Sequence, residues 1–101
     1  MQYNKLVRDK IPEIIKQDNK TPMIHIAENS EYWEKLKQKL LEEVNEFIVE
    51  PTNEELADIL EVVDAICDFK HFNKQELIHL KQQKVNKRGG FKKRIILEKV
   101  D

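Results

Sequence analysis

Two apolar stripes with helical spacing meet at Pro51, and they constrain the fold of this chain more than any other feature. In both stripes apolar residues recur at steps of three and four, the period of an α-helix. They comprise Trp33, Leu36, Leu40, Val44 and Phe47 before the proline, and Leu56, Ile59, Leu60, Val63, Ile66 and Cys67 after it. Because proline interrupts a helix and leaves only a short turn, the pattern predicts one helix over 30–50 and a second from Thr52 or Asn53 to about His71, packed antiparallel as a hairpin.

Signals for further elements lie on both sides of this hairpin. A brief helix is expected between Asp9 and Asp18, and a third long helix between the capping box that begins at Asn73 and the glycine pair at 89–90. Residues 23–27 (MIHIA) and 94–100 (RIILEKV) are expected to form a small strand pair. The predicted fold is therefore mainly α, a helical bundle with a peripheral strand pair, in a single domain over residues 1–101.

Length and composition limit the class of protein. A chain of 101 residues with 40% apolar residues can form a core but buries a modest share of its surface, so we expect a homodimer or homotetramer to complete the bundle. No apolar run approaches the length of about 20 residues that a helix needs to cross a bilayer. The lone cysteine, Cys67, forms no internal disulfide and fits a core position in a reducing cytoplasm. We expect a cytoplasmic protein without a membrane partner.

Charge is strongly segregated along the sequence. Residues 40–69 contain ten Asp or Glu and no Lys or Arg, whereas the remaining 71 residues contain 9 acidic and 18 basic residues. The net charge of −1 therefore conceals an acidic block and a basic remainder. Solvated helical faces usually mix both signs, because like charges at helical spacing repel. An acidic block of this kind raises the question of which cation neutralises it.

Helical geometry sorts the carboxylates of the block. At about 100° per residue, Glu43 and Glu46 on one helix and Glu55 and Asp58 on the other face the shared interior, whereas Glu42, Glu54 and Glu61 face solvent. Four converging carboxylates need a cation, because repulsion and desolvation would otherwise raise their pKa values. Oxygen ligands without Cys or His favour Mg²⁺, with Mn²⁺ as the alternative ion, over structural zinc.

Two simpler explanations of these acids remain open. The block could be a solvated acidic hairpin that holds no metal. Glu55 is also the fourth residue of a Thr52–Glu55 capping box and could serve only to begin its helix.

Basic residues supply a complement to the acidic block. Lys84 and Arg88 are four residues apart on the third long helix, and Lys5 and Arg8 lie near the N-terminus. Carboxylate-bound metal together with Lys and Arg suits a polyphosphate, whose oxygens take both kinds of partner. The alternative is a surface for nucleic acid. We expect no nucleic-acid partner, since the acidic block would repel a phosphate backbone and no interleaved aromatics offer stacking platforms.

The acidic pattern resembles the EExxE…ExxD motif of the all-α nucleoside triphosphate pyrophosphohydrolases, the MazG-like and phosphoribosyl-ATP pyrophosphohydrolase-like proteins, with EEVNE at 42–46 and ELAD at 55–58. The segments YNKLVRDKIPEII at 3–15 and KVNKRGGF at 84–91 look like a small MazG-like subgroup. The resemblance thus covers nearly the whole chain. It implies Mg²⁺-dependent hydrolysis of a nucleoside triphosphate between the α and β phosphates, which releases a monophosphate and pyrophosphate and fits a house-cleaning role.

The resemblance also implies roles for individual residues. The metal ligands would be Glu43, Glu46, Glu55 and Asp58, and the catalytic carboxylates would be Glu46, as the general base for water, and Glu43. Phosphates would be held by Lys84 and Arg88, with Lys5 and Arg8 as further candidates.

One departure from the family leaves the ligand set open. Eight residues separate Glu46 from Glu55, whereas larger members have a longer connection. With so short a turn, Glu61 or Asp64 could take the place of Glu55. Phosphoribosyl-ATP pyrophosphohydrolase activity, or a non-catalytic helical module for oligomerisation or partner binding, are the alternative functions.

Overall fold

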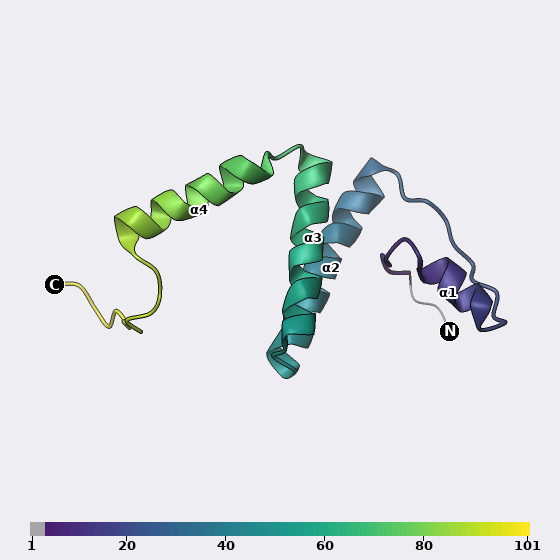
Figure 1. Ribbon diagram of the computed structural model, residues 1–101, viewed down its shortest axis with the longest axis horizontal. Helices are drawn as coiled ribbons and strands as arrows, with labels where there is room; N and C mark the ends of the chain where they lie inside the picture. Colours follow the sequence, from purple (N-terminus) through teal and green to yellow (C-terminus); the bar gives the residue numbers. More distant parts are fainter. Residues whose placement is uncertain (1–3) are drawn as a thin grey trace. The chain divides into compact units, whose positions relative to one another are not determined.

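The computed structural model describes residues 4–101, which contain four helices and no strand. The helices are α1 (Ile11–Gln17), α2 (Asn29–Val49), α3 (Asn53–Lys70) and α4 (Lys74–Arg88) (Figure 1). The mainly α class predicted from the sequence is confirmed. The chain forms two compact units, the first ending at Lys70 and the second beginning at His71.

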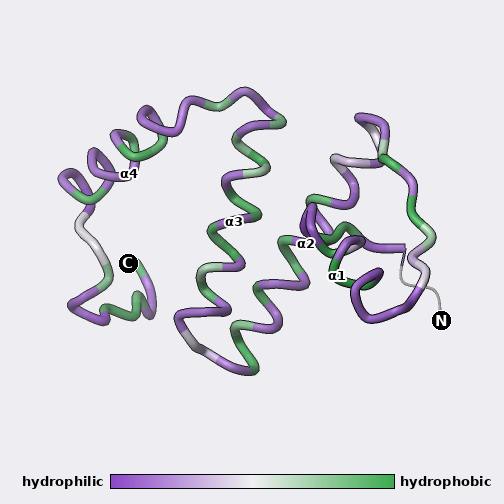
Figure 2. The backbone as a smooth tube through the Cα atoms, turned by 45° about the vertical axis from the view of Figure 1, so that its right-hand side comes forward, coloured by the Kyte–Doolittle hydropathy of each residue, from purple (hydrophilic) through white to green (hydrophobic). Residues whose placement is uncertain are grey.

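Helices α2 and α3 form the predicted antiparallel hairpin, and their packing provides the core of the first unit. Leu36 on α2 is 1% exposed, and Val62 and Cys67 on α3 are also buried. Hydrophobic and hydrophilic residues alternate along both helices at the helical period (Figure 2). The apolar stripe predicted for α2 is confirmed, because none of its five residues is exposed.

The turn of the hairpin is built by local hydrogen bonds around Pro51. The Thr52 amide donates to the Glu50 carbonyl at 2.9 Å, and the Thr52 hydroxyl accepts from the Glu55 amide at 3.2 Å. Thr52 therefore caps α3, as expected for a threonine directly before a helix. This cap fixes where the first turn of α3 begins and so which of its side chains face α2.

An aromatic cluster closes the end of the hairpin away from the turn. The Phe69 ring meets the Tyr32 ring edge-on at 5.2 Å and stacks on Trp33 at 6.1 Å between centroids. The Lys70 ammonium lies 4.1 Å from the centre of a Trp33 ring, a cation–π contact. With both ends held, the two helices keep a fixed register.

The ends of two other helices test the capping signals. In α4 the Asn73 side chain accepts a hydrogen bond from the Glu76 amide at 3.0 Å, and Gly89 ends the helix with φ of 82°. The start of the helix at an Asn73 cap and its end at Gly89 are confirmed, and the positive φ explains the glycine. Helix α2 begins one residue before the expected Ser30, with Glu28 at the cap position and no side-chain capping bond.

The expected strand pair is not formed. Residues 23–27 and 94–100 are irregular, and they belong to different compact units. Met23, Ile26 and Ile96 are 100%, 87% and 82% exposed. An isolated two-stranded ribbon gains little from pairing when neither strand packs on a core, so the apolar character of these segments was insufficient to make strands.

Part of the predicted α3 stripe is also exposed. Leu56 and Leu60 are 43% and 59% exposed, although the helical period assigns them to the buried face. A single partner helix covers only the centre of an apolar stripe, and residues at its edges need a further element to bury them. Leu41, Ile48 and Val49 on α2 are exposed as well.

Candidate functional site

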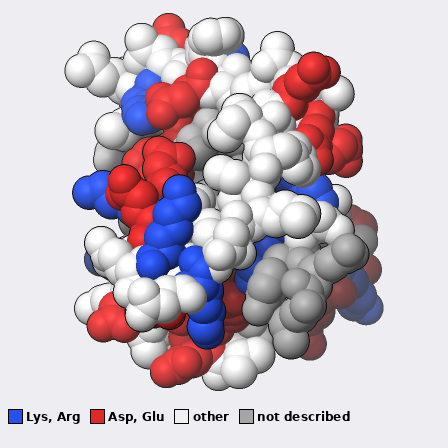
Figure 3. Space-filling model, turned by 90° about the vertical axis from the view of Figure 1, so that its right-hand side faces the viewer, with Lys and Arg blue, Asp and Glu red and all other residues white. Residues whose placement is uncertain are grey.

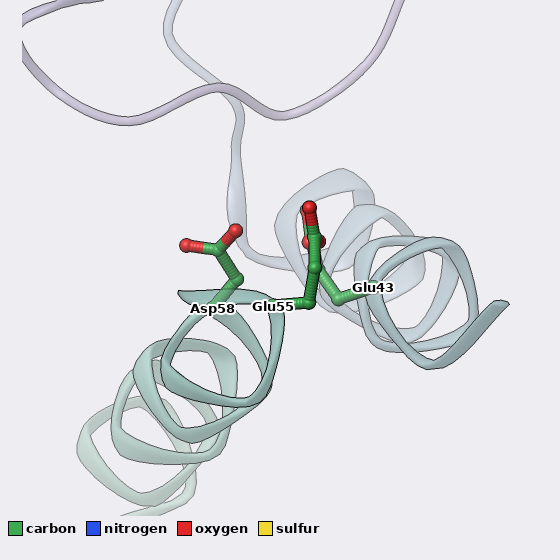
Figure 4. A group of neighbouring side chains, drawn as sticks. All are labelled: Glu43, Glu55 and Asp58. Atoms are coloured by element: carbon green, nitrogen blue, oxygen red, sulfur yellow. The ribbon is translucent and has the colours of Figure 1, made fainter. Parts of the chain in front are cut away.

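Three carboxylates converge near the turn of the hairpin. Glu43 from α2 and Glu55 and Asp58 from α3 each offer an oxygen, and these oxygens lie within 4.8 Å of one another. Figure 4 shows the Glu43 and Glu55 side chains next to each other between the two helices, with Asp58 one turn further along α3. We call these three residues the acidic cluster. They belong to the set that the sequence predicted.

Glu43 is the most deeply placed member of the acidic cluster. It is 6% exposed, and its Oε2 has no hydrogen-bond partner within residues 4–101. The Lys39 ammonium lies 3.3 Å from Oε1. Burial raises the pKa of Glu43 above its ordinary value, and the close approach of Glu46 adds to this, although Lys39 opposes both. A buried carboxylate oxygen without a donor is costly unless a cation satisfies it.

Glu55, like Glu43, has a buried carboxylate oxygen without a donor among the described residues. This bears on whether Glu55 is a metal ligand or only a helix cap. Its backbone amide is capped by Thr52, but the return bond of a capping box is not formed, since the Thr52 amide donates to Glu50 instead. Glu55 Oε2 is buried and unpaired among the described residues. Desolvation and then the charges of Asp58 and Glu43 raise the pKa of Glu55. Its carboxylate thus faces the acidic cluster and does not cap the helix.

Glu46 lies beside the acidic cluster in a more exposed position. Its side chain interacts with both Glu43 and Glu55, raising the pKa of the first and lowering that of the second. All four acids singled out by helical geometry are therefore neighbours in the structure.

Glu61 and Asp64, the alternatives to Glu55, are exposed and are not members of the acidic cluster. The short connection is accommodated because α3 starts directly after Thr52, which brings its first turn level with Glu46 and Glu43. Glu55 therefore keeps its place in the acidic cluster despite the short connection.

Cations from the N-terminal segment, residues 4–10, lie against these acids. Arg8 Nη2 is 2.7 Å from Asp58 Oδ1, and Lys5 Nζ is 3.3 Å from Glu42 Oε1. In Figure 4 the purple chain of the N-terminal region runs past the three side chains, and Figure 3 shows Lys and Arg among Asp and Glu on one face. Of the predicted phosphate-binding cations, Arg8 is thus paired with a predicted metal ligand, and Lys5 with Glu42, the residue before Glu43.

The surroundings of Glu42 differ from the prediction. The helical period points it to solvent, but its side chain is 30% exposed and bonds Lys39 Nζ at 2.9 Å as well as Lys5. Hydrogen bonding to Lys39 lowers the pKa of Glu42. The prediction was wrong because the N-terminal segment covers the face of α2 that α3 leaves open. Lys39 was missed as a functional neighbour, although its i,i+3 and i,i+4 spacing to Glu42 and Glu43 is a recognisable signal.

Lys84 and Arg88 lie on α4 in the second unit. No residue of this helix is buried, and the two cations are four residues apart, on adjacent turns. Their position near the C-terminus of the helix also suits the helix dipole, which favours positive charge there. Tyr3, the first residue of the family-like N-terminal segment, lies outside the described residues.

The acidic cluster fits a hard divalent cation. It offers only carboxylate oxygens, two of them buried and without a donor among the described residues, and Mg²⁺ prefers such ligands with the remainder supplied by water or phosphate. Cys67, the one thiol, is 3% exposed in the core, as predicted. Within residues 4–101 no helix has the length and apolar character to cross a bilayer.

Comparison with known proteins found a relative that matches part of this chain. An uncharacterized protein of Mycolicibacterium smegmatis is 51% identical over 41 residues, which are 41% of this chain and 42% of that protein. The match thus spans less than half the length of the curated relative. No family model matches the chain, and no solved structure matches it significantly.

Proposed function

We propose that this protein is a Mg²⁺-dependent nucleoside triphosphate pyrophosphohydrolase that cleaves the bond between the α and β phosphates. The observation that carries the proposal is the convergence of Glu43, Glu55 and Asp58, with buried oxygens of Glu43 and Glu55 unpaired among the described residues. An acidic surface that only keeps a protein in solution has no reason to bury carboxylates next to one another. The resemblance of 42–46 and 55–58 to the EExxE…ExxD pattern supplies the reaction class.

Each carboxylate has a role that follows from its position. Glu43, Glu55 and Asp58 would hold Mg²⁺, with Glu46 completing the set. When bound, the ion supplies charge neutralisation for phosphate oxygens and a lower pKa for water. Glu46 is the most accessible of the four and can take the proton of the attacking water, the task of a general base. Glu43, whose side chain interacts with that of Glu46, would be the second catalytic carboxylate.

Cations of the chain would bind the substrate phosphates. Arg8 and Lys5 already lie beside Asp58 and Glu42, so a triphosphate at the acidic cluster is within reach of positive charge. Lys84 and Arg88 are assigned the same role on the strength of the KVNKRGGF segment. Arginine and lysine both suit phosphate, the first through paired donors and the second as a point charge.

The hairpin would be completed by a second copy of the chain. Leu36, Val62 and Cys67 are the only buried apolar residues among those described, a small core for a chain of this length. Leu41, Leu56 and Leu60 leave apolar surface on the hairpin that self-association would bury.

A panel of ribo- and deoxyribonucleoside triphosphates tests the proposed activity, with pyrophosphate release measured in Mg²⁺. Phosphoribosyl-ATP belongs in the panel. We expect release from at least one compound, and a rate lower by about 10²–10⁴-fold in Glu46→Gln, the usual effect of losing a general base. Glu61→Gln, the same change at an exposed position of α3, should keep full activity.

Two outcomes would contradict parts of the proposal. Absence of pyrophosphate release from every compound would favour the non-catalytic helical module. Equal rates in Glu46→Gln and the wild type would refute the assignment of the base while leaving the activity intact.

A further inference from the structure

A cavity of about 220 Å³ lies between the N-terminal segment and α2. Its lining residues are Lys5, Leu6, Lys35, Gln38, Lys39 and Glu42. The α2 members follow the i, i+3, i+4, i+7 spacing of one helix face. That face is the one which α3 leaves open and which the N-terminal segment covers.

Positive charge dominates the lining of this cavity. Three ammonium groups, of Lys5, Lys35 and Lys39, face one carboxylate, that of Glu42. Glu42 accepts hydrogen bonds from both Lys5 and Lys39 at 3.3 and 2.9 Å. Lys35 donates to the Asn4 carbonyl at 2.6 Å, a neutral acceptor that leaves its charge uncompensated by that bond. Lys5 and Lys39 are thus paired with carboxylates, whereas the hydrogen bonds of Lys35 go to the neutral groups of Asn4 and Gln38.

Lys39 connects the cavity to the acidic cluster. Its ammonium is 2.9 Å from Glu42 Oε2 in the cavity and 3.3 Å from Glu43 Oε1 in the cluster. An anionic group in the cavity would thus lie one side chain away from the proposed metal ligands. Carboxylates that hold a metal and lysines that hold an anion are adjacent along the same face of α2.

We propose that this lysine cavity is the subsite for the terminal phosphates of the substrate, the part that leaves as pyrophosphate. The proposal rests on the proposed function and deepens it. Phosphate oxygens are strong acceptors for ammonium donors. A polyanion can bind two or three lysines at once, which a single carboxylate does less well. Ligand pockets for drug-sized molecules span about 300–1,000 Å³, so 220 Å³ suits a small anion and is too small for a whole nucleotide.

Binding of inorganic pyrophosphate in metal-free buffer tests the subsite without any need for turnover. Isothermal titration calorimetry of the wild type should show binding that weakens as salt is added. Lys35→Gln should reduce the affinity about tenfold, the effect of losing one charge-assisted hydrogen bond. Lys35 is chosen because its hydrogen bonds go to Asn4 and Gln38 and not to the acidic cluster.

Two matched variants separate charge at the cavity from general effects. Lys37→Gln removes the same charge two residues away on α2, at an exposed site paired with Glu34 and outside the lining, and should bind pyrophosphate as the wild type does. Lys35→Arg keeps the charge and should restore most of the affinity. If Lys35→Gln acted only by breaking the hydrogen bond to Asn4, the pyrophosphate affinity would not depend on whether residue 35 is charged.

A second pair of ligands locates the subsite along the substrate. An α,β-methylene nucleoside triphosphate should lose about tenfold in affinity to Lys35→Gln, as pyrophosphate does. A nucleoside monophosphate, which lacks the terminal phosphates, should be unaffected. Equal losses for both nucleotides would overturn the assignment to the terminal phosphates.

The subsite and the proposed activity can fail separately. Absence of pyrophosphate binding in the wild type, or equal binding in Lys35→Gln and Lys37→Gln, would overturn the subsite even if nucleotides are hydrolysed. Lysine-dependent pyrophosphate binding without any hydrolysis would support the subsite and refute the enzyme.

Discussion

Arg8 Nη2 lies 2.7 Å from Asp58 Oδ1, which joins residues fifty positions apart in the sequence. The guanidinium neutralises the outermost carboxylate of the acidic cluster, while Glu43 and Glu55 keep buried oxygens without a donor among the described residues. Both partners are partly exposed, so the pair adds little to stability. Its effect would be on the charge that a divalent ion or a phosphate meets at the proposed site.

Removing Arg8 should therefore strengthen binding of a divalent ion when nucleotide is absent. Without the guanidinium, Asp58 is released and the cluster gains one net negative charge. We expect Arg8→Gln to raise the affinity for Mn²⁺ about fivefold, which corresponds to ~1 kcal/mol for a partly exposed charge. Electron paramagnetic resonance of free Mn²⁺ measures this directly. Lys16→Gln, an equal charge change at an exposed position of α1, should leave the affinity unchanged, and an equal gain there would indicate a general charge effect.

The raised pKa of Glu55 predicts how stability depends on pH in metal-free protein. A carboxyl group whose folded pKa lies above its ordinary value of 4.5 adds stability below that pH, and this contribution is lost as pH rises through the folded pKa. Glu55→Gln should consequently be more stable than the wild type at pH 7, with the difference shrinking towards pH 4. Urea unfolding at the two pH values in EDTA is the measurement. Glu54→Gln, the exposed neighbour in the same turn, should show no such pH-dependent gain.

Mg²⁺ should stabilise the folded chain through the same residues. An ion present at ten times its Kd adds about 1.4 kcal/mol, which raises Tm by roughly 6–10 °C for a chain of this size. Glu55→Gln should lose most of this increase, and Glu54→Gln should retain it. If Mg²⁺ did not change the Tm of the wild type, or raised the Tm of both variants equally, Glu55 would not be a ligand of the ion.

The exposed apolar residues of the hairpin predict self-association. Leu60 is 59% exposed, and a charge there would oppose its burial against a second copy. We expect the wild type to sediment as a dimer or tetramer and Leu60→Glu to sediment as a smaller species. Leu97→Glu, at a 76% exposed position outside the helices, is the control and should not change the sedimentation. A monomeric wild type would refute the prediction.

Local rules were sufficient to predict most of the helix ends. The cap of α3 at Thr52, the cap of α4 at Asn73 and the end of α4 at Gly89 each depend on residues within a few positions of one another. The same holds for which acids face inward, because the helical period relates neighbours along one helix. The prediction of strands at 23–27 and 94–100 was wrong because strands do not depend on local sequence alone. A strand needs a partner strand and a core to pack on, and no short segment specifies these by itself.

The sequence by itself determined that two helices would turn at Pro51 and direct four carboxylates to one side of the pair. Only the tertiary structure decided that Glu55 faces Glu43 rather than capping its own helix, that Arg8 pairs with Asp58, and that Lys39 joins Glu42 to Glu43. Helix caps and faces arise from the bonding and periodicity of one stretch of backbone. Ion pairs and buried charge depend on which distant segment covers which face, and that is settled when the N-terminal segment folds against α2 and α3.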